Sequence, residues 1–216
     1  MNRQITFTVV ADGGTDRVLV PIIRWAIHRL DQEVDILEPE FVKRSGSVAE
    51  FFESYNSTTV LVFAHRDAEN SAVETRLREF DQVFLDGVVP IVPVRMSEAW
   101  LLIDGSAIAR AADSPNAGVA VPKLSRIEQI ADPKTELEQL LFKAAGSPTG
   151  RRGKNFRRSM VSRRVNLASL ISDYSPLEKL NAFAKFQISL AQVYPYPIAH
   201  SNQRDSRGAL ISHSDR

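Results

Sequence analysis

A chain of 216 residues with 44% hydrophobic and 25% charged residues is typical of one globular domain, or of one domain with a helical extension. It contains no cysteine, which excludes disulfides, thiol catalysis, iron–sulfur clusters and cysteine-based zinc sites. The formal net charge of +1 gives no global preference for nucleic acid or for a membrane surface. No apolar run approaches the roughly 20 residues that span a bilayer, and the N-terminus lacks a signal-peptide pattern, so we expect a cytoplasmic protein without a membrane partner.

The first hundred residues alternate between strand and helix patterns. Apolar and β-branched runs predict strands over 5–11, 34–42, 59–64 and 88–94. Apolar residues at helical spacing predict a helix over 15–30, mixed charges at helical spacing predict one over 69–81, and a short helix is expected over 47–55. Such alternation implies right-handed crossovers, so the expected fold class is α/β, with a mostly parallel, Rossmann-like sheet flanked by helices. Prolines in the second and fourth runs argue against central positions for those two strands.

After residue 97 the apolar spacing becomes helical. It predicts helices over 98–112, 124–131, 134–145, 157–172 and 176–192. We therefore expect an α/β domain over 1–112, a helical C-terminal extension over 113–193 and a mobile tail over 194–216, which is rich in Pro, Ser and Arg. The apolar stripe of the last helix would either cover the sheet or form the seam of a homodimer.

Acidic residues follow three of the predicted strands, two after each. They are Asp12 and Asp16, Asp67 and Glu69, and Glu98 and Asp104. The carboxyl ends of parallel strands are where α/β proteins bind ligands, and converging carboxylates repel one another unless a cation lies between them. Mg²⁺, or Mn²⁺, would supply that charge and would support phosphoryl transfer or phosphodiester cleavage. Taken singly, each acid has a simpler explanation as a helix cap, a turn residue or a first-turn residue favoured by the helix dipole.

Three segments resemble motifs of a known family. Residues 9–16 (VVADGGTD) and 61–69 (LVFAHRDAE) resemble the first and second motifs of Toprim-type domains, which are a strand with Glu-Gly and a strand ending in Asp-x-Asp. The stretch 98–104 (EAWLLID), with Pro93 before it and Asp132-Pro133-Lys134 after it, is similar to the bacterial Toprim-like proteins of the DUF4276 type, distant relatives of OLD-type nucleases. The resemblance covers about residues 5–145, and the last stretch is its most specific part.

The resemblance implies a Mg²⁺-dependent hydrolase of the nuclease type that acts on nucleic acid phosphodiesters, within a bacterial defence or mobile-element system. Asp12 stands at the position of the family's catalytic Glu, and Asp67 and Glu69 stand at the metal-binding pair. Glu98 is the second catalytic candidate, and Asp16 and Asp104 complete the candidate metal ligands.

Two departures from the family pattern keep an alternative open. Asp12 is one methylene shorter than the family's Glu, and Glu69 is one methylene longer than the family's Asp. The alternative is a catalytically degenerate binding subunit that docks a partner protein such as an ATPase. A further alternative is a phosphohydrolase of small phosphorylated substrates, with Arg66 and Arg95 binding the phosphate.

Residues 151–164 (RRGKNFRRSMVSRR) are strongly basic and contain no acid. Arginine binds phosphate oxygens bidentately, so the segment predicts binding to a nucleic acid backbone without sequence readout. The candidate phosphate-binding residues are Arg66 at the strand end and, in the segment, Arg151, Arg152, Lys154, Arg157 and Arg158. A solvated basic face, or a docking surface for an acidic protein, would give the same composition.

Overall fold

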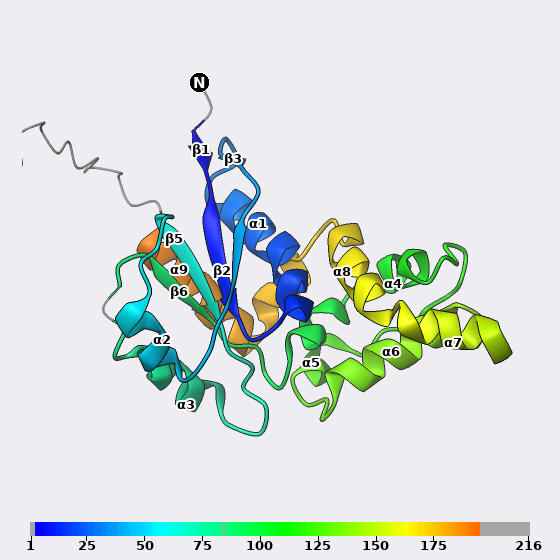
Figure 1. The fold of residues 1–216 in the computed structure, drawn as a ribbon. Helices are drawn as coiled ribbons and strands as arrows, with labels where there is room; N and C mark the ends of the chain where they lie inside the picture. The colour runs from blue at the N-terminus through cyan, green and yellow to red at the C-terminus, as the bar shows by residue number, and fades with distance from the viewer. Residues whose placement is uncertain (1–2, 84, 195–216) are drawn as a thin grey trace, which may run out of the picture.

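The structure is a computed structural model that describes residues 3–83 and 85–194. Its fold is α/β and Rossmann-like, as the sequence predicts, with parallel strands flanked by helices (Figure 1). The strands are β1 (Gln4–Ile5), β2 (Phe7–Ala11), β3 (Asp35–Ile36), β4 (Glu40–Lys43), β5 (Leu61–His65) and β6 (Val88–Ile91). The helices among them are η1 (Gly14–Val18), α1 (Leu19–Leu30), α2 (Val48–Ser54), α3 (Val73–Leu77) and η2 (Arg78–Phe80).

The main sheet has the strand order β4-β2-β5-β6, and β1 pairs separately with β3; all of these pairs are parallel. Every residue of the central strands β2 and β5 is buried, which is typical of strands covered on both faces. The edge strands β4 and β6 are partly exposed. Pro39 directly precedes β4 and Pro90 lies within β6, so the position of both strands agrees with the missing N–H donor of proline.

Two layers of helices cover the sheet because alternate residues of a strand point to opposite faces. Phe7 and Val9 of β2 belong to the main core, which includes α1 and α9 (Asn181–Val193). Val10 belongs to a smaller core with Val48 and Phe52 of α2. Helices α1 and α9 therefore lie on one face of the sheet, and α2 lies on the other.

Helix α9 settles the alternative that the sequence left open for 176–192. The ring of Phe186 lies 6.2 Å from that of Phe63 in β5, and the ring of Phe183 lies 5.1 Å from that of Trp100. These aromatic pairs adopt edge-to-face geometry, which adds to the stabilisation from their buried area. The apolar stripe of α9 thus covers the sheet.

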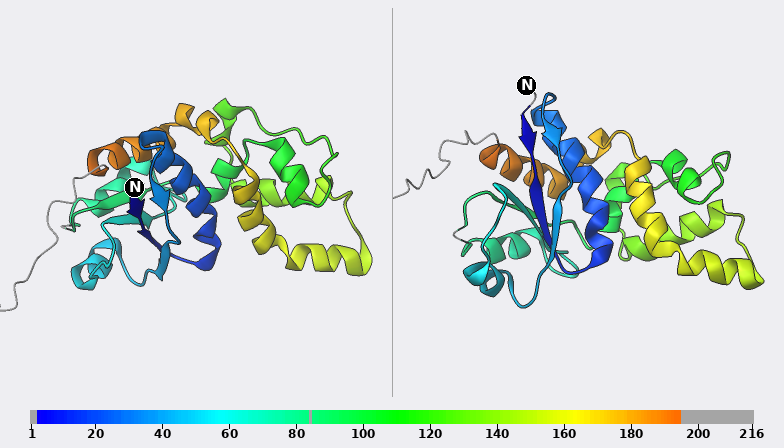
Figure 2. Two further views of the ribbon diagram at one scale, coloured as in Figure 1. Left: turned by 90° about the horizontal axis from the view of Figure 1, so that it is seen from above. Right: turned by 45° about the horizontal axis from the view of Figure 1, so that its top comes forward.

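The chain after β6 is helical. Its elements are η3 (Ser97–Leu101), α4 (Gly105–Ala111), α5 (Leu124–Ile127), α6 (Pro133–Ala144), α7 (Gly150–Arg158), α8 (Met160–Leu170) and η4 (Ser175–Lys179), followed by α9. Figure 2 shows α4 to α8 gathered at one side of the sheet, with α7 at the far end. Trp100, Leu137 and Leu167 continue the main core from the sheet into these helices, so the predicted extension packs on the α/β part through a shared core.

Several predicted boundaries differ from the structure. The strand predicted over 34–42 is divided into β3 and β4, and the helix predicted over 69–81 begins at Val73 and is divided into α3 and η2. The strand predicted over 88–94 ends at Ile91, and the helix predicted over 124–131 ends at Ile127.

The helix predicted over 98–112 is divided into η3 and α4, because the side chain of Asp104 accepts a hydrogen bond from the backbone N–H of Ala107 and begins a new helix. The helix predicted over 157–172 is divided at Ser159, and its first part begins at Gly150. The predicted mobile tail begins at Tyr194, but this residue is buried and hydrogen-bonded to Asp31 at 2.9 Å. The other residues of the predicted tail lie outside the described residues. Within 3–83 and 85–194, no helix has the length and apolar character needed to cross a bilayer.

Candidate functional site

The carboxyl ends of the strands carry an inner cluster of charged side chains. We define this inner cluster as Asp16, His65, Asp67, Glu98 and Arg164. Its members come from η1, from the end of β5 and the loop after it, from η3 and from α8. The cluster therefore lies where the sheet meets the helical part of the chain.

His65 is the centre of the inner cluster. Its Nε2 lies 3.0 Å from Asp67 Oδ1, and its Nδ1 lies 3.5 Å from Asp16 Oδ2. Burial alone would lower the pKa of His65, but the two carboxylates outweigh burial and raise the pKa to about 10. The ring is therefore protonated at neutral pH, and its charge is shared between two acids.

Backbone N–H groups complete the coordination of both carboxylates. Asp16 accepts a hydrogen bond from the N–H of Gly13 at 3.0 Å, and Asp67 accepts one from the N–H of Ser97 at 3.1 Å. Burial opposes ionisation of Asp16, but His65 and the backbone donors together hold the pKa of this carboxyl below its usual value. Both acids are thus satisfied by groups of the chain itself.

Glu98 and Arg164 form a buried ion pair between η3 and α8. Arg164 also lies 3.7 Å from Glu138 of α6, so one guanidinium connects three elements. Burial raises the pKa of Glu98 and the charge of Asp67 raises it further, although Arg164 opposes this. The pair joins the helical part of the chain to the edge of the sheet.

An outer chain of alternating charges runs along the same edge. We define it as Arg44, Asp12, Arg66, Glu79, Arg76 and Glu69. Asp12 contacts Arg44, and Arg66 Nη1 lies 3.4 Å from the second oxygen of Asp12. Glu69 pairs with Arg76 at 3.2 Å and has a left-handed backbone with a φ of 53°. Glu69 therefore pairs with an arginine of α3 rather than sharing a ligand with Asp67.

The described residues do not fit the Mg²⁺ or Mn²⁺ site that the sequence suggested. Nowhere in 3–83 and 85–194 do three or more His, Asp or Glu side chains form a group that could hold a metal ion. The physical reason is that five of the six candidate acids are paired with a cation of the chain, and Asp104 accepts a hydrogen bond from a backbone N–H. Those pairings are Asp12 with Arg44 and Arg66, Asp16 and Asp67 with His65, Glu69 with Arg76, Glu98 with Arg164, and Asp104 with the first turn of α4.

Asp104 has the clearest structural role of the six acids, because it is the N-cap of α4 and accepts from the N–H of Ala107 at 2.9 Å. Asp104→Ala is expected to lower the free energy of unfolding by about 1 kcal/mol, and Asp104→Asn to change it little, since Asn caps helices equally well. Urea unfolding of the three proteins measures this. Equal losses in both variants would show that the charge of Asp104 matters rather than its cap.

Five members of the two clusters escaped the site prediction: His65, Arg44, Arg76, Glu79 and Arg164. His65 ends a strand that is otherwise wholly apolar, which is a signal of a buried polar partner. Arg164 lies on the buried face of α8 with Met160 and Leu167. Its helical spacing from these two apolar residues is a sequence signal of a buried charge. No comparable pattern marks Arg44.

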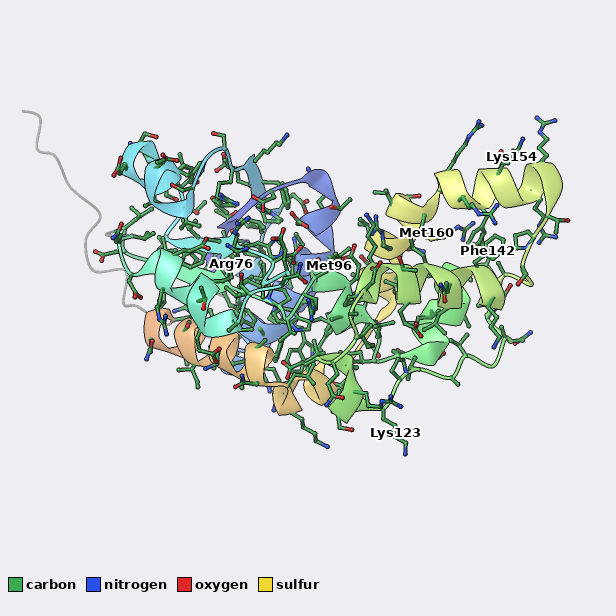
Figure 3. The ribbon with its side chains drawn as sticks, turned by 90° about the horizontal axis from the view of Figure 1, so that it is seen from below. Arg76, Met96, Lys123, Phe142, Lys154 and Met160 are labelled. Carbon is green, nitrogen blue, oxygen red and sulfur yellow. The ribbon has the colours of Figure 1, made fainter. Side chains whose placement is uncertain are left out.

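Helix α7 carries charge of a different kind, because its cations are exposed. They are Arg151, Arg152, Lys154, Arg157 and Arg158, and none of the ion pairs found in the described part of the chain involves them. The helix contacts the protein through Gly153 and Phe156, its two buried residues. Figure 3 shows Lys154 pointing outward at the end of the molecule.

The packing of α7 on α6 fixes its orientation. The ring of Phe156 lies 5.8 Å from that of Phe142 in α6, in edge-to-face geometry. Arg157 lies over the Phe142 ring, with its guanidinium carbon 4.6 Å from the ring centroid. A Cβ at Gly153 would lie 2.3 Å from the carbonyl oxygen of Pro148, so only glycine permits this close approach. The basic face is therefore presented on a rigid support.

Comparisons with family models, with curated proteins and with solved structures found no match. The Toprim-type resemblance stays a prediction from the sequence.

Proposed function

We propose that this protein binds the phosphate backbone of nucleic acid through α7, with the α/β body as the scaffold that presents the helix. The observation that carries the proposal is the contrast between two sets of cations. The four arginines of the inner cluster and the outer chain are paired with acids, whereas the five cations of α7 are exposed and have no acid among the residues of their helix. The whole chain has a net charge of only +1. The positive charge that nearby acids do not balance is therefore concentrated on α7.

The shape of α7 suits a polyanion. Nine helical residues span about 14 Å, which is enough to reach several successive phosphates of a nucleic acid strand. Arg151, Lys154 and Arg158 share the outer face at helical spacing, opposite the buried Gly153 and Phe156. Four of the five cations are arginines, whose planar guanidinium binds phosphate oxygens bidentately.

Cleavage of the bound strand is not part of the proposal. Metal-dependent hydrolysis needs free carboxylates at the strand ends, and the six candidates are engaged by His65, by arginines or by backbone N–H groups. The phosphohydrolase alternative meets a similar obstacle. Arg66 is paired with Asp12 and Glu79, and Arg95 donates to the carbonyl of Glu69 at 3.2 Å.

Docking of an acidic protein, such as a partner ATPase, is the second candidate. It uses the same exposed cations of α7. It requires no metal chemistry, which agrees with strand-end acids that are paired with cations of the chain. Nucleic acid is the better candidate because the outer face repeats arginine and lysine without an interleaved exposed apolar residue, as a phosphate backbone requires and as protein interfaces seldom show.

The test is binding of a labelled duplex of about 20 base pairs, measured by fluorescence anisotropy near physiological salt. The triple variant Arg151→Ser/Lys154→Ser/Arg158→Ser is expected to bind at least about ten-fold more weakly than the wild type, because three phosphate contacts are lost. The matched control Lys43→Ser/Lys123→Ser/Arg126→Ser removes the same charge from exposed positions outside α7 and is expected to bind like the wild type. Equal weakening in both variants, or no binding by the wild type, would contradict the proposal; the second outcome would favour the acidic protein partner.

A further inference from the structure

A cavity of about 350 Å³ lies beside α7. Arg152, Asn155, Ser159 and Arg163 line it, and their spacing of three and four residues places them along one side of α7 and the start of α8. Two chain segments close the cavity, one with Ala112 and Asp113 after α4 and one with Ala145 and Pro148 after α6. Its volume falls within the range of roughly 300–1,000 Å³ that is usual for small-ligand sites.

Arg163 forms a fixed planar wall of this cavity. Its Nη1 donates to the carbonyl of Ala111 at 2.6 Å, its Nη2 to Asp113 at 2.7 Å and its Nε to the hydroxyl of Ser159 at 2.9 Å. Its guanidinium carbon lies 4.2 Å from the centroid of the Phe156 ring, which packs against one face of the group and is itself part of the cavity lining. A guanidinium held in this way presents a flat surface without losing conformational entropy on binding.

The rest of the lining supplies hydrogen-bonding groups around that surface. Asn155 is exposed and offers both a donor and an acceptor, and the carboxylate of Asp113 accepts. Arg152 is exposed at the mouth of the cavity and belongs to the cations of α7. The cavity therefore combines a planar surface for stacking, polar groups that can hydrogen-bond to the edge of a planar ring, and an adjacent cation that can bind a phosphate.

We infer that this cavity takes one unpaired nucleobase, which stacks on Arg163 while the cations of α7 hold the flanking phosphates. Bases that are free of a duplex are recognised by stacking on aromatic rings or on guanidinium planes and by hydrogen bonds to their edges. The cations of α7 contact the backbone of single and double strands alike, and the cavity adds affinity for a single strand or for a nucleic acid end. This inference rests on the proposed function, because the same helix supplies the phosphate contacts.

The first measurement compares two labelled single strands of about 12 units with equal numbers of phosphates: an oligothymidylate and a strand of abasic residues. The wild type is expected to bind the oligothymidylate about ten-fold more tightly, the effect of one stacked base. Equal affinity for the two strands, with both still sensitive to salt, would overturn the nucleobase site and leave the proposed function standing. Failure to bind either strand would overturn both.

A pair of variants then locates the effect. Asn155→Ala is expected to weaken binding of the oligothymidylate several-fold and to leave the abasic strand unchanged, because only the base contact is lost. Asn166→Ala, also at an exposed position but on α8 away from the cavity lining, is the control and is expected to change neither affinity. Both positions are exposed, so neither variant should unfold the protein. Equal loss for the two strands in Asn155→Ala would show that the residue serves the backbone and would overturn the inference.

Discussion

Replacing Arg164 by methionine is expected to lower the free energy of unfolding by about 3 kcal/mol. The side chain of Arg164 is 4% exposed, and it pairs with Glu98, which is nearly as buried. Removing the guanidinium leaves the Glu98 carboxylate without a partner in a region of low dielectric constant, and a buried unpaired charge is costly. Urea unfolding of the wild type and the variant at neutral pH gives the difference.

The double variant Glu98→Gln/Arg164→Met separates the ion pair from simple loss of packing. Because it removes both charges, it is expected to recover part of the stability that the single variant loses. Additive losses in the double variant would show that Glu98 and Arg164 are not energetically coupled. The result also bears on function, because the pair fixes α8, and α8 follows directly on the helix that presents the cations.

Replacing His65 by glutamine is expected to have an effect of similar size, about 3 kcal/mol near neutral pH, because Asp16 and Asp67 lose the cation between them. The effect depends on pH with a definite sign. The pKa of His65 is raised from the ordinary 6.5 to about 10, so its charge stabilises the folded state fully below about pH 6.5. This contribution declines as the pH rises toward about 10.

The stability difference between wild type and His65→Gln should therefore shrink between about pH 7 and about pH 10. Urea unfolding at several pH values measures it, and His28→Gln, at an exposed position outside the inner cluster, is the control. A difference that stays constant over this range would mean that His65 is not held protonated by the two acids.

Local pattern was enough to predict the fold class and most of the sheet. The run 59–64 is almost wholly apolar, and the structure confirms a central strand buried on both faces over Leu61–His65. The prolines near 39 and 90 indicated edge strands, because a missing N–H donor is a local property. The break at Ser159 was not predictable in the same way, since helical apolar spacing continues across it from Phe156 to Met160.

The candidate site shows where sequence reasoning stops. Five of the six candidate acids lie in the two charge clusters at the strand ends, and Asp104 caps α4 instead. Three of the five have cation partners that are distant in sequence. Arg44 follows Asp12 by 32 residues, and Arg164 follows Glu98 by 66. Which cation neutralises which acid is decided by tertiary packing, so a set of paired charges has the same sequence pattern as a metal site.

The salt dependence of nucleic acid binding tests the central claim most directly. The logarithm of the binding constant falls linearly with the logarithm of salt concentration, with a slope of about −0.9 per phosphate contact on duplex DNA. If the five cations of α7 make the contacts, the wild-type slope should be about −4.5, and Arg151→Ser/Lys154→Ser/Arg158→Ser should reduce its magnitude by about 2.7. An identical slope for the wild type and this variant would contradict the account, because the binding would then lie on another surface.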